Sequence, residues 1–294
     1  MKRSTLLIGL AVAVILILVG ARLYFSYGDF GLDNPFWNGI GSLPSDVNAQ
    51  PLYSDSGLSG IDSHDTLLIV SPTVNFTSEE SGDVLAFLNR GGRVVVMDDF
   101  GRSDSLLSAI GSPVIIDPVP MCQYDNYYVN QSFPIITNFS SSAYFDNVSS
   151  IVMNHPAVLN VSGGDVLATT SSMAWLDYND DSVLDNNESV GTYPVIASAE
   201  FNGAGQLIVI SDPDIIINGM LDKGSNQAFM SNLLSGVVWV DVSHGRGLST
   251  LDSFYFLVKG QIIVQLLLAL FVLACGLAFV KRKTIMRLFK RKDH

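Results

Sequence analysis

The distribution of hydrophobic residues divides the chain into two apolar ends and a mixed central part. Residues 6–21 (LLIGLAVAVILILVGA) and 261–280 (QIIVQLLLALFVLACGLAFV) contain no charged residue. A helix needs about 20 consecutive apolar residues to cross a bilayer about 30 Å thick, and the second run has that length. We therefore predict a transmembrane helix over residues 259–280. Residues 1–27 are predicted to be a second transmembrane anchor or a signal peptide, because the first run ends in small residues typical of a cleavage site.

Between these ends, short apolar runs alternate with segments of helical periodicity. Residues 66–70 (TLLIV), 93–97 (RVVVM) and 113–116 predict buried strands. A helix is predicted from Ser78 to the stop at Gly91-Gly92, and a shorter helix over residues 103–110. A strand, a helix and a second strand at this spacing predict parallel strands joined by right-handed crossovers.

The same pattern returns after about 45 residues rich in Asn, Ser and Tyr. Residues 166–170, 193–201 and 206–211 predict strands, and residues 226–239 predict a helix with apolar residues four apart. The simplest interpretation is one α/β domain over residues 28–258, with an inserted loop region at about residues 119–192. His244 to Gly247, just before the C-terminal apolar run, is interpreted as a flexible connection.

The charges predict how the chain lies across the membrane. Lys2 and Arg3 precede the first apolar run, and seven Lys and Arg residues follow the second in a basic tail, residues 281–294. The positive-inside rule therefore places both termini in the cytoplasm and the main domain outside the cell. Residues 28–258 hold five Lys and Arg and 27 Asp and Glu, a net charge of −22. Such acidity argues against nucleic acid as a partner, because nucleic-acid binding needs basic surface. The predicted partners are the lipid bilayer and a membrane protein complex.

Sequons for N-glycosylation give a second reason to place the domain outside. The Asn-x-Ser/Thr triplet occurs six times in this domain, and glycan addition requires a surface position. The alternative is that a chain rich in Asn and Ser contains such triplets by chance. The candidate glycosylation sites are Asn75, Asn130, Asn138, Asn147, Asn160 and Asn187.

One acidic stretch, residues 177–188 (DYNDDSVLDNNE), has the ligand order of a calcium loop. Oxygen-bearing side chains occupy loop positions 1, 3, 5, 9 and 12, and a backbone carbonyl serves position 7, as a hard cation with oxygen ligands requires. The predicted ligands are Asp177, Asn179, Asp181, Val183, Asp185 and Glu188. Ser182 stands where glycine usually makes the sharp turn. The alternative is a solvated acidic loop. We expect a lone loop between strands, with calcium in a structural role.

A second group of carboxylates follows predicted strands. Asp98 and Asp99 come directly after residues 93–97, and Asp212 and Asp214 follow residues 206–211. Ligands of open α/β sheets bind at the carboxyl ends of the strands, so these four residues form a candidate ligand cleft. The alternative interpretation of Asp212 is a turn residue that binds its own backbone and caps the next helix.

The segments TLLIVSP, FLNRGGRVVVMDDFG and GQLIVISDPDIIINGM, followed by NQAFMSNLL, resemble the extracytoplasmic domain family DUF4350. The resemblance covers most of residues 30–245, and its most specific parts are residues 34–39 (NPFWNG) and 211–214 (SDPD). It implies a flavodoxin-like or class I glutamine amidotransferase-like fold, a parallel sheet flanked by helices. It also implies a relation to proteins encoded beside ABC transporters, and the two anchors resemble archaeal members. The family brings no established activity.

Two classes of function remain open. The amidotransferase nucleophile is absent, since no G-x-C-x-G or G-x-S-x-G follows a predicted strand. Ser103 or Ser105 could replace it only with a histidine base, and His64 and His155 are interpreted as loop residues. We therefore favour a non-catalytic membrane accessory protein that binds a ligand or partner. The alternative is a cell-envelope hydrolase that uses the cleft carboxylates as acid and base, at a separation that sequence does not give.

Overall fold

A computed structural model describes residues 28–245 of the protein, which lie in one structural unit. The predicted membrane segments and the basic tail lie outside the described residues. Within residues 28–245, no helix is long and apolar enough to cross a bilayer.

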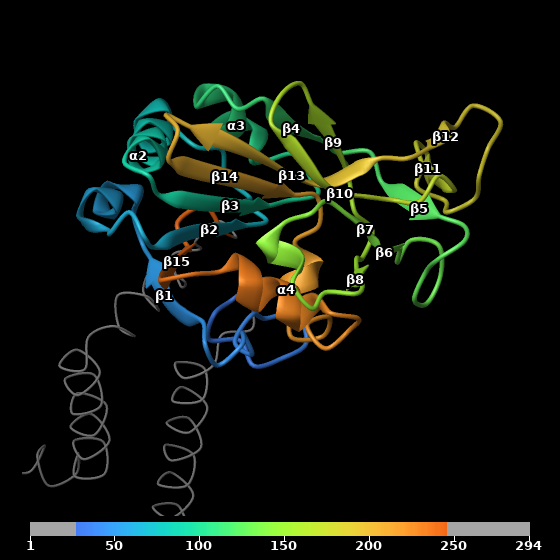
Figure 1. The fold of residues 1–294 in the computed structure, drawn as a ribbon, viewed down its shortest axis with the longest axis horizontal. Helices are drawn as coiled ribbons and strands as arrows, with labels where there is room; N and C mark the ends of the chain where they lie inside the picture. The colour runs from blue at the N-terminus through green and yellow to red at the C-terminus, as the bar shows by residue number, and fades with distance from the viewer. Residues whose placement is uncertain (1–27, 246–294) are drawn as a thin grey trace, which may run out of the picture. The chain divides into compact units, whose positions relative to one another are not determined.

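A mixed sheet of eight strands forms the centre of the fold (Figure 1). Its strands, in spatial order, are β1 (Asn48–Leu52), β15 (Val237–Asp241), β2 (Thr66–Val70), β3 (Arg93–Met97), β14 (Gly205–Ile210), β13 (Pro194–Phe201), β10 (Asp165–Thr169) and β7 (Asn138–Phe139). The first five strands run parallel, and the last three add to the sheet in antiparallel pairs. The sheet is thus mostly parallel, and the carboxyl ends of five strands meet at one edge.

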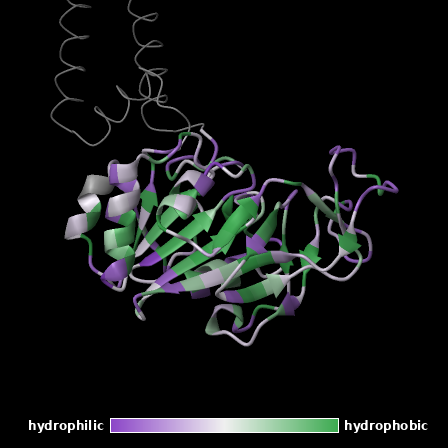
Figure 2. Cartoon of the chain, turned by 90° about the horizontal axis from the view of Figure 1, so that it is seen from above, coloured by the Kyte–Doolittle hydropathy of each residue, from purple (hydrophilic) through white to green (hydrophobic). Residues whose placement is uncertain are grey.

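Helices cover both faces of this sheet. On one face, α2 (Ser78–Asn89), α3 (Asp104–Ala109) and the 3-10 helix η1 (Asp55–Gly60) pack on one hydrophobic core. On the other face, α4 (Asn226–Leu233) packs on a second core with the 3-10 helices η2 (Ala143–Phe145) and η3 (Asp214–Ile216). Every residue of β2 is buried, as expected for a strand covered on both sides. Figure 2 shows the hydrophobic colour concentrated along the central strands and the hydrophilic colour on the loops.

The first predicted crossover is confirmed. β2, α2 and β3 occupy the expected residues, and β2 pairs in parallel with β3. Helix α2 begins with a capping box, in which Thr77 accepts from the Glu80 amide and Glu80 accepts from the Thr77 amide. It ends before Gly92, where a Cβ atom would lie 2.5 Å from the Phe87 ring. The predicted strands at β10, β13 and β14 are also present.

The second predicted crossover is wrong. Strand β4 (Val114–Asp117) follows α3 but does not join the parallel sheet; it pairs antiparallel with β9 (Val158–Val161). The place beside β3 is taken by β14, which pairs with β3 along all five residues of β3. A short strand with alternating exposure, as in β4, suits a two-stranded ribbon at the surface better than a buried central position.

The predicted helix over residues 226–239 is also too long. Helix α4 ends at Leu233, Gly236 adopts a φ of 68°, and β15 begins at Val237. The helix ends because the backbone of Leu234 is already extended, and the β-branched residues after the left-handed turn at Gly236 favour a strand. Strand β15 then pairs with β1 on one side and with β2 on the other.

The inserted region contains small sheets of its own as well as β7 and β10. Strands β5 (Met121–Gln123), β11 (Ala174–Leu176) and β12 (Val190–Gly191) form a three-stranded antiparallel sheet. Strands β6 (Ile135–Ile136) and β8 (Ile151–Val152) form a further pair. The acidic stretch 177–188 connects β11 to its neighbour β12, so it is a loop between strands, as predicted.

Candidate functional site

Two polar clusters lie where the parallel strands end. We name the first the acid cluster; it comprises Asp98 and Asp99 after β3, and Asp212 and Asp214 after β14. We name the second the His244 latch; it comprises Glu80 of α2, Asp241 of β15 and His244. The sequence predicted the residues of the first cluster but not the second.

Asp98 is fully buried and serves the local fold. Its Oδ1 accepts from the amide of Phe100 at 2.9 Å. Its Oδ2 accepts from the amide of Ser103 at 2.8 Å and from the Ser103 hydroxyl at 2.7 Å. The carboxylate therefore fixes the turn between β3 and α3, and it uses the hydroxyl of Ser103, one of the two serines considered as a nucleophile.

Asp212 and Asp214 are joined by Asn154, which the sequence did not single out. The Asn154 amide donates to Asp212 Oδ2 at 2.6 Å, and its side-chain nitrogen donates to Asp214. Asp212 Oδ1 accepts from the amide of Asp214 at 2.7 Å, which confirms the predicted turn. Burial, followed by the nearby charge of Asp214, raises the pKa of Asp212 well above its usual range. Burial also raises the pKa of Asp214. Both carboxyls therefore tend to hold a proton more strongly than exposed aspartates do.

Asp99 is the least satisfied member of the acid cluster. Within residues 28–245, its Oδ1 is buried and has no hydrogen-bond partner. Burial, with smaller contributions from the charges of Asp98 and Asp214, raises the pKa of Asp99 to about 7. A carboxyl that titrates near neutral pH can act as a proton donor or acceptor, and groups of this kind gather at functional sites.

The NPFWNG segment packs against residues 218–219, which follow η3. Asn218, soon after η3, donates to the carbonyls of Asn34 at 3.0 Å and Phe36 at 2.6 Å. Gly39 allows the tight turn, because a Cβ there would lie 2.1 Å from the Asn34 carbonyl oxygen. The two most specific parts of the sequence, residues 34–39 and 211–214, are therefore linked through the segment that follows β14.

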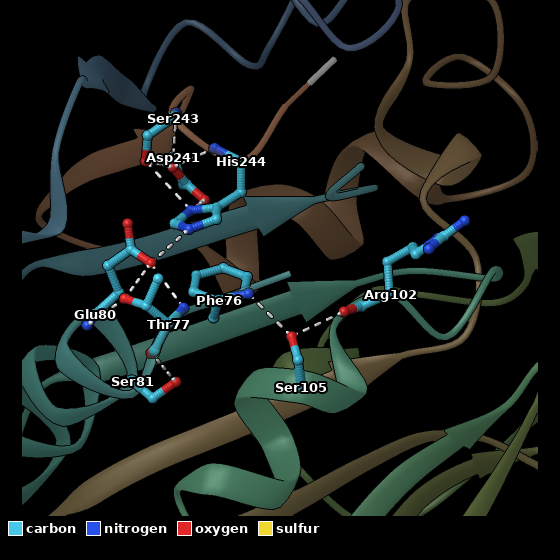
Figure 3. Close-up of polar contacts among 9 residues, drawn as sticks. All are labelled: Phe76, Thr77, Glu80, Ser81, Arg102, Ser105, Asp241, Ser243 and His244. Atoms are coloured by element: carbon cyan, nitrogen blue, oxygen red, sulfur yellow. Dashed lines mark hydrogen bonds and ion pairs between the residues drawn. The ribbon is translucent and has the colours of Figure 1, made fainter. Parts of the chain in front are cut away.

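His244 is buried and not part of a flexible connection, so that expectation is wrong. Its Nδ1 lies 2.8 Å from Asp241 Oδ2 and its Nε2 lies 3.4 Å from Glu80 Oε2 (Figure 3). Its side chain is 3% exposed. Ser243 Oγ is 3.2 Å from Nδ1, but it also bonds to Asp241 Oδ1 at 2.6 Å. A sequence signal that could have pointed here is the spacing of Asp241 and His244, three residues apart directly after the apolar residues 237–240.

The remaining serine and histidine candidates, Ser105, His64 and His155, have other partners than one another. Ser105 Oγ accepts from the amide of Phe76 at 3.0 Å and donates to the Arg102 carbonyl at 3.2 Å. His64 is 92% exposed and contacts Asp62, and His155 contacts Asp180 at 3.2 Å. Both histidines lie in loops, as predicted, and within residues 28–245 neither side chain hydrogen-bonds to Ser103 or Ser105.

The predicted calcium loop brings its polar side chains together. Asn179 Nδ2 donates to Asp181 and to Asp185, each at 3.1 Å. The carboxylate of Glu188 accepts from two loop amides, at 3.0 and 2.9 Å. Ser182 has a φ of 59°, the left-handed conformation that glycine usually provides at this position. The loop thus makes the turn of a calcium loop with serine in place of glycine.

The first predicted ligand, Asp177, is fully buried beneath this loop. Its two oxygens accept from the amides of Asp181 at 3.1 Å and Ser182 at 2.7 Å. Among residues 28–245, no three His, Cys, Asp or Glu side chains are grouped so that they could hold a metal ion. The predicted calcium ligands also include the Asn179 side chain and the Val183 carbonyl, which are not among these four residue types. Calcium binding therefore stays a prediction.

The six sequon asparagines are all exposed, which is the position that glycan addition requires. Asn75 lies in the loop before α2, and the other five lie in the inserted region. Their glycosylation stays a prediction. Cys122 is free and buried, and burial raises the pKa of its thiol to about 11.

These features define a mixed α/β protein with a mostly parallel sheet and titratable groups at its carboxyl edge. Residues 47–234 match the family described as "Domain of unknown function (DUF4350)", and the chain belongs to this family. Among solved structures, it is similar to the mmIFT52 N-terminal domain, with 18% identity, a TM-score of 0.47, and coverage of 62% of this chain and 79% of that chain. It is also similar to the exo-β-1,4-mannosidase Op5Man5 from Opitutaceae bacterium strain TAV5, with 14% identity, a TM-score of 0.35, and coverage of 64% and 27%. A comparison with curated proteins gives no match.

Proposed function

We propose that this protein is a non-catalytic, membrane-anchored accessory protein whose α/β domain binds a ligand or partner outside the cell. In this proposal the domain has a flavodoxin-like, class I glutamine amidotransferase-like fold and serves an ABC transporter or another ATPase-linked membrane complex. Residues 1–27 and 259–280 hold the chain in the bilayer, and both termini face the cytoplasm. The apolar runs and the flanking Lys and Arg residues support this orientation.

The observation that carries the proposal is that the fold itself uses the reactive groups at the carboxyl edge. Asp98 accepts three hydrogen bonds from its own turn. Both ring nitrogens of His244 face carboxylates, and the side chain is only 3% exposed. A catalytic base must come within hydrogen-bond reach of the proton it removes, and a buried, paired imidazole does not. These contacts favour a structural role for both groups.

The direct test is purification of the tagged full-length protein from its native membranes in mild detergent, followed by mass spectrometry. We expect a permease or an ATPase subunit in stoichiometric amount. A parallel purification of the variant Trp37→Ala, which truncates a side chain that is 72% exposed, tests whether the NPFWNG segment contacts the partner. Recovery of the intact protein alone from both preparations would contradict the accessory function.

Calcium is proposed as a structural ion of the 177–188 loop. The order of oxygen donors and the left-handed turn at Ser182 support it. Asp181 and Asp185 already lie against the same Asn179 amide, so a cation placed between them would relieve their mutual repulsion. The ion would stabilise the conformation of the β11–β12 connection and take no part in a catalysed reaction.

A second candidate function is a cell-envelope hydrolase, and one observation favours it. Asp99 has an unpartnered buried oxygen and a pKa of about 7, which suits a general acid or base. The test compares envelope glycan and peptide hydrolysis by the wild-type protein and by Asp99→Asn. A loss of about 100-fold or more with retained fold would support the enzyme. Equal rates for the two proteins would exclude Asp99 from catalysis.

A further inference from the structure

The segment that leaves the last strand crosses the start of α2 and is tied to it. The amide of Thr73 donates to the His244 carbonyl, and the Thr73 hydroxyl donates to the Gly245 carbonyl, both at 2.7 Å. The ring of Phe76 stacks on the His244 ring with centroids 3.6 Å apart. The latch contacts to Asp241 and Glu80 complete the attachment (Figure 3). Backbone bonds, a ring stack and charges thus join residues 73–80 to residues 241–245.

The contacts of the ring favour one charge state of His244. Neutral imidazole has one N–H donor and one acceptor nitrogen, whereas imidazolium has two donors. Both ring nitrogens of His244 face carboxylate oxygens, at 2.8 and 3.4 Å. A neutral ring would direct an acceptor nitrogen at one of these carboxylates. The two contacts are favourable together only when the ring carries the positive charge.

We propose that the His244 latch is a charge-dependent clasp, which holds the exit segment of the domain on α2 while His244 is imidazolium and releases it when the ring loses a proton. The clasp lies within residues 28–245, so it is independent of the accessory function. Residues 246–258 connect this segment to the predicted C-terminal membrane helix.

The direction of the pH dependence follows from the groups around the ring. Among the described residues, the charged groups that face it are Asp241 from β15 and Glu80 from α2; residues 71–77, which cover it, contain no charged side chain. Hydrogen bonds from Thr77, and to a smaller extent the charge of His244, lower the pKa of Glu80. Glu80 thus stays ionised to a lower pH than a free glutamate does. The clasp is closed at acidic to neutral pH and opens as the pH rises through the titration of His244.

The test is hydrogen–deuterium exchange of the full-length protein in detergent between about pH 5 and 9, with rates corrected for intrinsic exchange. For peptides that cover residues 241–245, we expect exchange to rise about tenfold or more across this range in the wild type. His244→Gln should exchange fast at every pH. His155→Gln is the matched control, because it removes a histidine side chain that contacts Asp180 in the inserted region, and it should follow the wild type.

A second variant keeps the proposal testable if His244→Gln does not fold. Glu80→Gln removes the charge that faces Nε2 but keeps a side chain that can complete the capping box with Thr77. With one carboxylate fewer, opening should shift to lower pH. Nitrogen-15 NMR of labelled histidine adds an independent readout, with both ring nitrogens of His244 expected to be protonated at neutral pH. A neutral ring at pH 7, or identical pH profiles for wild type and Glu80→Gln, would overturn the proposal.

Discussion

Phe76 and His244 are 168 residues apart in the chain, yet their rings stack with an interplanar angle of 17°. Phe76 is 7% exposed and also belongs to the core between the sheet and α2. One aromatic side chain thus contacts both the hydrophobic core and the polar latch. This double contact makes it a sensitive position for the stability of the domain.

We expect Phe76→Ala to lower the free energy of unfolding by about 3 to 4 kcal/mol, because it leaves a cavity in the core and removes the stack on His244. Urea denaturation followed by tryptophan fluorescence measures this change. Phe100→Ala is the control, since Phe100 is 71% exposed and its loss should cost little. Similar losses for the two variants would contradict the role assigned to Phe76.

Asp99 should make stability depend on pH. A carboxyl with a raised pKa favours the folded state when it is protonated, so its contribution is lost as the pH rises from about 4 to about 7. Asp99→Asn should therefore raise the melting temperature at pH 8 and flatten this part of the profile. Asp165→Asn, at an exposed position, provides the control for removal of one negative charge. A wild-type profile with the same slope as Asp99→Asn would contradict the assignment.

Calcium should stabilise the domain if the 177–188 loop binds it. At a calcium concentration about 100 times the dissociation constant, the gain is about 2.7 kcal/mol, seen as a rise in melting temperature. Asp181→Asn, at a ligand position, should abolish most of this rise. Asp180→Asn removes the same charge at the preceding, non-ligand position and should keep it. A calcium response that survives in Asp181→Asn would place the ion elsewhere.

Gly39 should not tolerate a side chain. A Cβ atom there would lie 2.1 Å from the Asn34 carbonyl oxygen, so Gly39→Ala must displace the loop of residues 34–39. We expect a loss of about 2 kcal/mol or more in the free energy of unfolding. At Gly60, in contrast, a Cβ would meet nothing within 4 Å, and Gly60→Ala should be nearly neutral. Equal stability of the two variants would show that the loop adapts freely.

The elements that were predicted well are those with strong signals in their own local sequence. β2 and β3 are continuous apolar runs, and α2 has a capping box, a helical period and a glycine stop. β15 was missed because apolar residues at spacings of four continue from α4 into a strand, and only residues 234–236 separate the two elements. β4 was assigned to the wrong sheet because local pattern does not encode the partner of a strand.

The same limit applies to the candidate site. Asp98, Asp99, Asp212 and Asp214 could be named because each follows a strand, and parallel strands end at one edge. Asn154 and the His244 latch could not, because their partners lie far away in the sequence. Glu80 is 164 residues from His244, and Asn154 is 58 residues from Asp212. Contacts of this kind appear only when the topology of the sheet is known.

The place of β15 in the sheet sets the order of events during synthesis. β1 comes first in the described chain, but its partner in the central sheet is β15, the last strand, which also covers one side of β2. Until residues 237–241 have left the ribosome, β1 therefore lacks its partner in the sheet, and one edge of β2 stays unpaired. Pairing between such distant segments is slow, and an open strand edge can pair with other chains. A nascent chain that stalls before residue 237 would expose the edge of β2, so protection of that edge depends on the last strand that is made before the predicted membrane helix.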